Sequence, residues 1–201
     1  MDWTTVKSLI IPQGEVRKIV NSSGSVIWEK SEGEYTFIEC LEIPSGTILD
    51  TGIACESTDY YYVDFAPVSV PAYGSIIYAG ARKILRVYVD GTNIQMKMDW
   101  YNQNTATAVA GTRLNMAFEN QITYLNGVQK TNMSGVPNFT PTTNVKIGGL
   151  NAKWRLYGCR HGKTSDTLDF DYVPAIRNSD SVAGLYNNIT GAFLPYGSAV
   201  Q

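Results

Sequence analysis

The sequence predicts an all-β protein, a sandwich or a barrel of short strands. Turn signals recur about every ten residues along the chain, and no stretch shows a sustained helical period. Gly (18) and Tyr (13) are plentiful, while charged residues make up only 17%, a balance that suits strands and tight turns. A chain of 201 residues has room for one sizeable domain and a small appendage.

The first part of the chain, residues 1–31, is predicted to form a separate three-stranded meander. Its β-rich runs cover residues 6–12, 15–20 and 25–29, and glycine-bearing turns separate them. These strands have too few apolar residues for a core of their own, so they must pack on the main domain or on a partner. We therefore expect an anchoring or assembly element, with an intramolecular clasp as the alternative.

Residues 34–201 are predicted to form the main domain. Asp90-Gly91 and Asn126-Gly127 each lie between alternating runs and predict hairpins, because both residue types tolerate positive φ. Residues 182–186 are the one place where a turn or a short helix is expected. The predicted strands of this domain cover residues 35–43, 60–65, 75–79, 85–89, 93–98, 121–125, 128–130, 144–148, 153–159 and 168–173.

Composition argues against several classes of partner and site. The formal net charge is −2 and no run of Lys and Arg occurs, so binding to nucleic acid is not expected. The N-terminus lacks the apolar core of a signal peptide, and no window approaches the ~18 apolar residues of a membrane span. Three cysteines without CxxC spacing predict free thiols and no cofactor, with a Cys40–Cys55 bridge left open.

The C-terminal third carries a resemblance to a known family. Residues 171–177 (DYVPAIR) and 184–193 (GLYNNITGAF) resemble the ending of a lectin-like domain found in tail and surface proteins of gut bacteria and their phages. Asn187 stands where that pattern usually has Asp. Weaker matches to laminin-G/concanavalin A-like domains extend the resemblance over residues 34–198, at residues 49–53, 124–128, 147–150 and 154–159.

The resemblance implies a two-sheet antiparallel jelly roll, concanavalin A-like, after the N-terminal meander. Residues 1–31 are similar to short modules that open phage structural proteins, which implies a virion protein made in the cytoplasm of a bacterial host. The expected function is non-enzymatic attachment to a host glycan or cell surface by a tail or head appendage. The alternative is a structural decoration protein of the capsid or tail with no ligand. The resemblance further implies a homo-oligomer, a trimer by analogy with fibres, that contacts other virion proteins through residues 1–31.

Candidate catalytic groups are few. Asp169 and Asp171 alternate on one strand face but lack a third acid, so a solvent-facing pair is expected rather than a glycosidase site. His161, the only histidine, is expected to be a polar loop residue, because no partner that would orient it as a base is identifiable. A calcium ion held by Asp and backbone oxygens stays open, as some laminin-G relatives use one.

Two segments could bind a sugar, which needs an aromatic ring and amide or carboxylate groups. Residues 99–104 supply both in a predicted loop tip, with burial of Trp100 at the sandwich edge as the alternative. Tyr60 and Tyr62 share one face of a predicted strand and Tyr61 takes the other, so part of this cluster is expected in the core. Trp154 and Tyr157 are also expected in the core. The candidate ligand-binding residues are Asp99, Trp100, Tyr101, Asn102, Asn104 and Tyr60.

Overall fold

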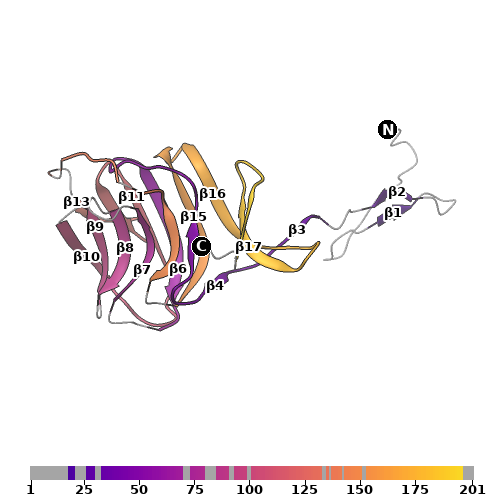
Figure 1. Ribbon diagram of the computed structural model, residues 1–201, viewed down its shortest axis with the longest axis horizontal. Helices are drawn as coiled ribbons and strands as arrows, with labels where there is room; N and C mark the ends of the chain where they lie inside the picture. The colour runs from indigo at the N-terminus through magenta and orange to yellow at the C-terminus, as the bar shows by residue number, and fades with distance from the viewer. Residues whose placement is uncertain are drawn as a thin grey trace.

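The computed structural model describes most of residues 33–196 and two short strands before them. All regular structure in the described residues is β-strand, and every strand pair is antiparallel (Figure 1). The described residues are 18–20, 26–29, 33–69, 73–79, 85–90, 93–98, 101–132, 135, 137–141, 143–150 and 153–196.

The larger sheet has ten strands in these residues. They are β3 (Tyr35–Phe37), β4 (Leu41–Ile43), β6 (Tyr60–Pro67), β11 (Leu114–Glu119), β12 (Ile122–Leu125), β13 (Val128–Asn132), β15 (Trp154–Thr164), β16 (Thr167–Arg177), β17 (Val182–Asn187) and β18 (Phe193–Pro195). The order across the sheet is β13-β12-β11-β6-β15-β16-β17-β18, and β3 pairs with β16 while β4 pairs with β15.

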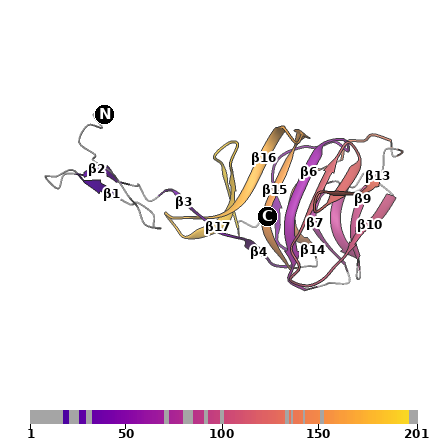
Figure 2. The ribbon, with the colours of Figure 1, turned by 180° about the vertical axis from the view of Figure 1, so that it is seen from behind.

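The smaller sheet has six strands in the part of the chain that is described. They are β5 (Ile48–Asp50), β7 (Tyr73–Ala79), β8 (Leu85–Asp90), β9 (Asn93–Met98), β10 (Tyr101–Thr107) and β14 (Lys146–Leu150). Their order is β10-β9-β8-β7-β14-β5, so β10 and β5 are its edge strands. The two views show the two sheets as stacked layers (Figures 1 and 2).

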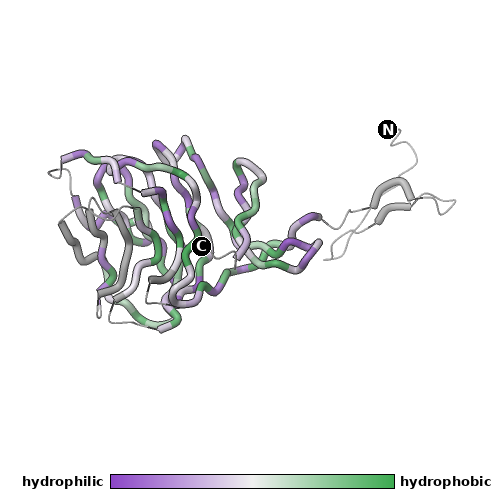
Figure 3. The backbone as a smooth tube through the Cα atoms, viewed as in Figure 1, coloured by the Kyte–Doolittle hydropathy of each residue, from purple (hydrophilic) through white to green (hydrophobic). Residues whose placement is uncertain are grey.

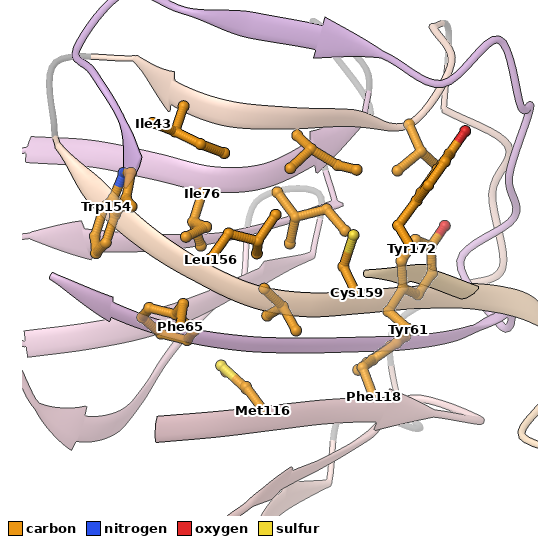
Figure 4. Close-up of a cluster of buried hydrophobic side chains, with 14 of the residues drawn as sticks. Ile43, Tyr61, Phe65, Ile76, Met116, Phe118, Trp154, Leu156, Cys159 and Tyr172 are labelled. Carbon is orange, nitrogen blue, oxygen red and sulfur yellow. The ribbon is translucent and has the colours of Figure 1, made fainter. Parts of the chain in front are cut away.

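The core lies between the two sheets. Strand alternation sends every second side chain of β6 and β11 inward, and the buried residues of both sheets form one cluster. Figure 3 shows the matching alternation of hydrophobic and hydrophilic residues along the strands, and Figure 4 shows part of the core. Its largest fully buried side chains include Trp154, Phe65, Phe118, Phe170, Ile43 and Ile76. The predicted fold, a two-sheet antiparallel jelly-roll sandwich of concanavalin A-like class, is confirmed.

The predicted hairpin at Asn126-Gly127 is confirmed. Both residues have positive φ, 49° and 75°, and Leu125 pairs with Val128 across a two-residue turn. The Asn126 side chain accepts a hydrogen bond from the backbone N–H of Asn115, which ties the turn to β11. Asp90 likewise pairs with Asn93 between β8 and β9.

Three local predictions differ from the structure. Residues 35–43 form two strands, because β3 pairs with β16 whereas β4 pairs with β15. Residues 182–186 are part of β17 and not a helix, because the backbone of β17 pairs with β16 on one side and with β18 on the other. Strand β11 was not among the predicted strands.

The C-terminal motif around Asn187 builds a hairpin between β17 and β18. The Asn187 side chain is buried and accepts hydrogen bonds from the backbone N–H groups of Asp171 (3.2 Å) and Ile189 (3.0 Å). Gly191 takes a φ of 72° in the same turn. Asn187 therefore has a structural role in this chain.

The N-terminal meander is described only in part. Strands β1 (Lys18–Val20) and β2 (Val26–Glu29) pair antiparallel, as two of the three predicted strands would. The first predicted strand lies outside the described residues, and the assembly role of residues 1–31 stays a prediction.

The three cysteines, Cys40, Cys55 and Cys159, are free thiols, so the Cys40–Cys55 bridge does not form. Burial raises the pKa of Cys55 to about 11, and burial also raises the pKa of Cys159. None of the described segments forms a helix that could span a membrane.

Trp154→Ala is expected to lower the free energy of unfolding by about 3–5 kcal/mol, the usual cost of removing a buried large aromatic side chain. Trp154 is fully buried and packs edge-on against Phe65, with ring centroids 5.6 Å apart. Urea unfolding measures the change. Val128→Ala, at a side chain 58% exposed, is the control and should stay within about 0.5 kcal/mol of the parent. Equal effects of the two variants would contradict the assigned core.

Native protein treated with iodoacetamide at pH 8 should be alkylated at Cys40 and spared at Cys55 and Cys159. The thiolate is the reactive form, and burial suppresses it at the two protected positions. Peptide mass spectrometry reads the sites, and all three should react once the chain is unfolded in urea. Labelling of Cys55 as fast as Cys40 in the folded protein would disprove the assignment.

Candidate functional site

The candidate site lies on the outer face of the ten-stranded sheet. On β6, Tyr61, Val63 and Phe65 point into the core, so Tyr60, Tyr62 and Asp64 lie on the opposite face. Here the predicted split of the tyrosine cluster agrees with the structure.

A β-bulge in β15 decides which of its side chains reach this face. Leu156 pairs with Phe65 and Gly158 pairs with Asp64, so Tyr157 is an extra residue opposite β6. The bulge reverses the alternation, so that Arg160 lies on the outer face. Tyr157 is only half-buried, because a residue three positions from Trp154 on a strand faces the opposite side, and the prediction that it joins Trp154 in the core is wrong.

The first cluster on the outer face is centred on Arg113. Its guanidinium makes two hydrogen bonds of 2.9 Å to the Asp64 carboxylate and lies 3.9 Å from the centroid of the Tyr157 ring. The carboxylate raises the pKa of Arg113. The Tyr62 hydroxyl lies 3.5 Å from the same carboxylate. Asp64 thus joins a cation and a phenol over one pair of strands.

The second cluster is centred on Arg160. Its Nε donates to Asp171 Oδ1 at 2.9 Å, and its guanidinium lies 5.2 Å from the centroid of the Tyr62 ring. Asn188 donates from its side-chain amide to the other Asp171 oxygen at 3.1 Å. Burial raises the pKa of Tyr60 and the charge of Arg160 lowers it, which places Tyr60 beside this cluster although it is almost fully buried.

Strand register aligns these groups into one row. Ala117 of β11 pairs with both Tyr124 and Tyr62, Tyr62 pairs with Arg160, and Arg160 pairs with Asp171. We call the residues Tyr124, Ala117, Tyr62, Arg160, Asp171 and Asn188 the outer-face row. Small Ala117 separates two tyrosines on the same face. The row therefore presents phenol rings, a guanidinium, a carboxylate and an amide side by side across five strands and the end of β17.

Such a row can bind a sugar. Aromatic rings contact the apolar C–H face of a pyranose, and charged or amide groups hydrogen-bond its hydroxyls. The Arg160 side chain is 47% exposed, and its carboxylate partner fixes its position.

A third polar cluster, at one end of the sheet, surrounds the buried His161. His161 is 0% exposed on β15, with Nε2 3.3 Å from Asp59 Oδ2 and Nδ1 3.1 Å from Asp169 Oδ2. Lys163 Nζ lies 3.0 Å from the other Asp59 oxygen. The expectation that His161 is a polar loop residue is wrong, because His161 is a buried residue of β15 with a carboxylate near each ring nitrogen, although neither nitrogen makes a hydrogen bond to a described side chain. Asp59 and Asp169 come from segments far apart in the sequence, so spacing could not reveal them.

Asp169 and Asp171 lie outside the core on β16, as their alternation predicts, but they serve different partners. Asp169 contacts His161, whereas Asp171 contacts Arg160 and Asn188. The register shift of β16 against β15 at His161/Gly162 accompanies this separation. They do not act as a single acidic pair.

The predicted sugar-binding loop is not a loop over most of its length. Tyr101, Asn102 and Asn104 belong to β10 and pair with Met98, Lys97 and Gln95 of β9, because the backbone there continues the smaller sheet at its edge. Asp99 and Trp100 lie outside the described residues. Of the candidate residues, only Tyr60 lies beside the outer-face row, and its role in binding stays a prediction.

Sequence reasoning missed Tyr62, Arg160 and Asp171 as one group. Their common face follows from strand pairing and from the bulge at Tyr157, and no sequence motif joins them. Over the described part of the chain, no three His, Cys, Asp or Glu side chains are grouped so that they could hold a metal ion.

No family model matches the chain, and no curated protein matches it. Among solved structures it is similar to the alginate lyase from Corynebacterium sp., at 13% identity and a TM-score of 0.39 over 57% of this chain. The chain spans 61% of the length of that structure. It is also similar to the alginate lyase AlgAT5 from Polysaccharide Lyase family 7, at 14% identity and a TM-score of 0.34, over 71% of this chain and 81% of that one.

Both of these structures are enzymes by title. The prediction of a non-enzymatic protein of a virion surface, whether for attachment or for decoration, is wrong on this finding. Nothing in the comparisons supports a bacteriophage, virion or fibre assignment. The jelly-roll class rests on the two sheets described above.

The stability of the protein is expected to fall as the pH drops below about 6.5, the ordinary pKa of histidine. Burial lowers the pKa of His161, although Asp59 and Asp169 oppose that shift. The unfolded chain therefore binds a proton that the folded chain resists, and stability rises with pH through this window. Urea unfolding at pH 5.5 and 7.5 measures the difference.

His161→Gln is the matched variant, since glutamine keeps a donor and does not titrate. Its stability should change less than that of the parent between the two pH values. An unchanged pH dependence in His161→Gln would show that other groups cause it.

Proposed function

We propose that the protein binds a polysaccharide chain on the outer face of the ten-stranded sheet, along the outer-face row. The observation that carries the proposal is Tyr62, whose ring centroid lies 5.2 Å from the Arg160 guanidinium and whose hydroxyl lies 3.5 Å from the Asp64 carboxylate. A sugar stacked on this ring has charged donors and acceptors on both sides.

The rigidity of the row supports binding rather than chance exposure. Arg160 of the row and the neighbouring Arg113 are each held by a carboxylate at 2.9 Å, and each guanidinium lies near a tyrosine ring. Groups already held in place lose little conformational entropy when a ligand binds. Strands position such groups better than loops do.

Cleavage of the bound polymer is the second candidate. Tyr62 and Arg160 lie together on the row, and a phenol can transfer a proton while a guanidinium neutralises a carboxylate. Asp171, which holds Arg160, adds an acceptor beside them. The experiment below therefore follows the polymer as well as the protein.

The experiment measures binding of the full chain to neutral and uronate-containing polysaccharides by affinity electrophoresis and calorimetry. Tyr62→Ala should weaken binding about tenfold, since one ring contact is worth about 1–1.5 kcal/mol. Arg160→Gln should weaken it as well. Arg155→Gln is the matched control: it is on the same strand and also 47% exposed, but pairs with Glu42 away from the row.

Thermal unfolding checks that each variant is folded, and gel filtration of the polymer follows its chain length. Shortening by the parent but not by Tyr62→Ala or Arg160→Gln would make the row a site of polysaccharide cleavage. Failure of the folded parent to bind any polymer, or equal binding by the parent and Tyr62→Ala, would overturn the proposal.

A further inference from the structure

Four aromatic side chains meet at one end of the ten-stranded sheet, on β3, β17 and β18. The Tyr35 ring lies 4.8 Å from that of Tyr186 and 5.2 Å from that of Phe193, and Phe37 meets Tyr186 edge-on at 5.5 Å. We call these four residues the aromatic cluster. Figures 1 and 2 both place β3 and β17 on the side of the ten-stranded sheet away from β10 and β13.

The aromatic cluster lies on the same face as the outer-face row. Leu185 of β17 is in the core, so its neighbour Tyr186 points to the outer face. Tyr186 pairs with Val173 of β16, two residues beyond Asp171, and Asp171 belongs to the row. The two sets are therefore joined along β16.

The cluster is held in place by its surroundings. Gly184 lies beneath Phe193, and a Cβ at this position would be 2.6 Å from Phe193 Cζ and 2.4 Å from a backbone oxygen. Arg177, paired with Asp180, lies 5.2 Å from the Phe193 ring centroid. A side chain at position 184 would clash with the Phe193 ring, so glycine there allows the ring to pack against the sheet.

Polar groups lie beside the rings. The Tyr35 hydroxyl donates to Glu34 at 3.0 Å, and Arg177 pairs with Tyr35 across the two strands, on the same face. Phe37 is 60% exposed, although a phenylalanine ring gains free energy when it leaves water. An exposed ring with hydrogen-bonding groups nearby suits a sugar, which has both apolar C–H faces and hydroxyls.

We propose that the aromatic cluster is a second platform for the same polysaccharide, reached by a chain that continues from the outer-face row along β16. The inference rests on the proposed function of that row. Asp171 lies four residues from Ala175, which pairs with Phe37, so the two platforms are about 13 Å apart along the strand. Oligosaccharides long enough to bridge this span contact both platforms, and shorter ones contact only the row.

The test is the affinity of oligosaccharides of increasing length, prepared from the polymer that binds best. Phe37→Ala should weaken the longest oligosaccharides about tenfold, as one lost ring contact does, and leave the shortest unchanged. Tyr62→Ala should weaken all lengths. Val128→Ala is the control, because Val128 is 58% exposed on β13, far from the cluster in the strand order.

The outcomes separate the two proposals. If Tyr62→Ala weakens binding but Phe37→Ala has no effect at any length, the second platform is disproved and the row stands. If the parent binds no oligosaccharide, both proposals fail. Light scattering tests whether a second copy of this chain, rather than a sugar, occupies the cluster. A loss of self-association in Phe37→Ala with unchanged sugar binding would make the cluster a contact between copies of this chain and overturn the inference.

Discussion

The pairing of β6 with β15 at the centre of the ten-stranded sheet is the constraint on which the rest of the structure depends. It brings Phe65 and Leu156 together on the inner face, and Tyr62 and Arg160 together on the outer face. A sheet has two faces with strict alternation, so one register decides the core and the candidate site at once. The site is therefore as rigid as the core beneath it.

The bulge at Tyr157 determines which side chains of β15 face the core after it. Without the extra residue, alternation from Trp154 would turn His161 outward and Arg160 inward, against the core. With the bulge, Cys159 and His161 join the inner face and Arg160 joins the outer one. A single inserted residue thus separates the buried His161 from the exposed Arg160 of the outer-face row.

The buried His161 cluster and the outer-face row have different physical roles. Asp59, His161 and Asp169 connect the start of β6 with β15 and β16, and His161 packs 4.8 Å from the Tyr61 ring in the core. Its buried imidazole contacts protein groups on both nitrogens. The row keeps Arg160 half-exposed while the Asp171 carboxylate fixes it. His161 of the first is enclosed with the core, whereas the second is open to solvent.

The sequence by itself determined most of the strands and the turn at Asn126-Gly127, because these depend on local alternation and on residues that accept positive φ. It also indicated that Tyr60 and Tyr62 share a face. Only the tertiary structure decided that β17 is a strand, because its backbone pairs with two neighbouring strands, β16 and β18. The same holds for the row itself. Tyr62, Arg160 and Asp171 are brought together by pairing between strands distant in sequence and by a bulge that has no local signature.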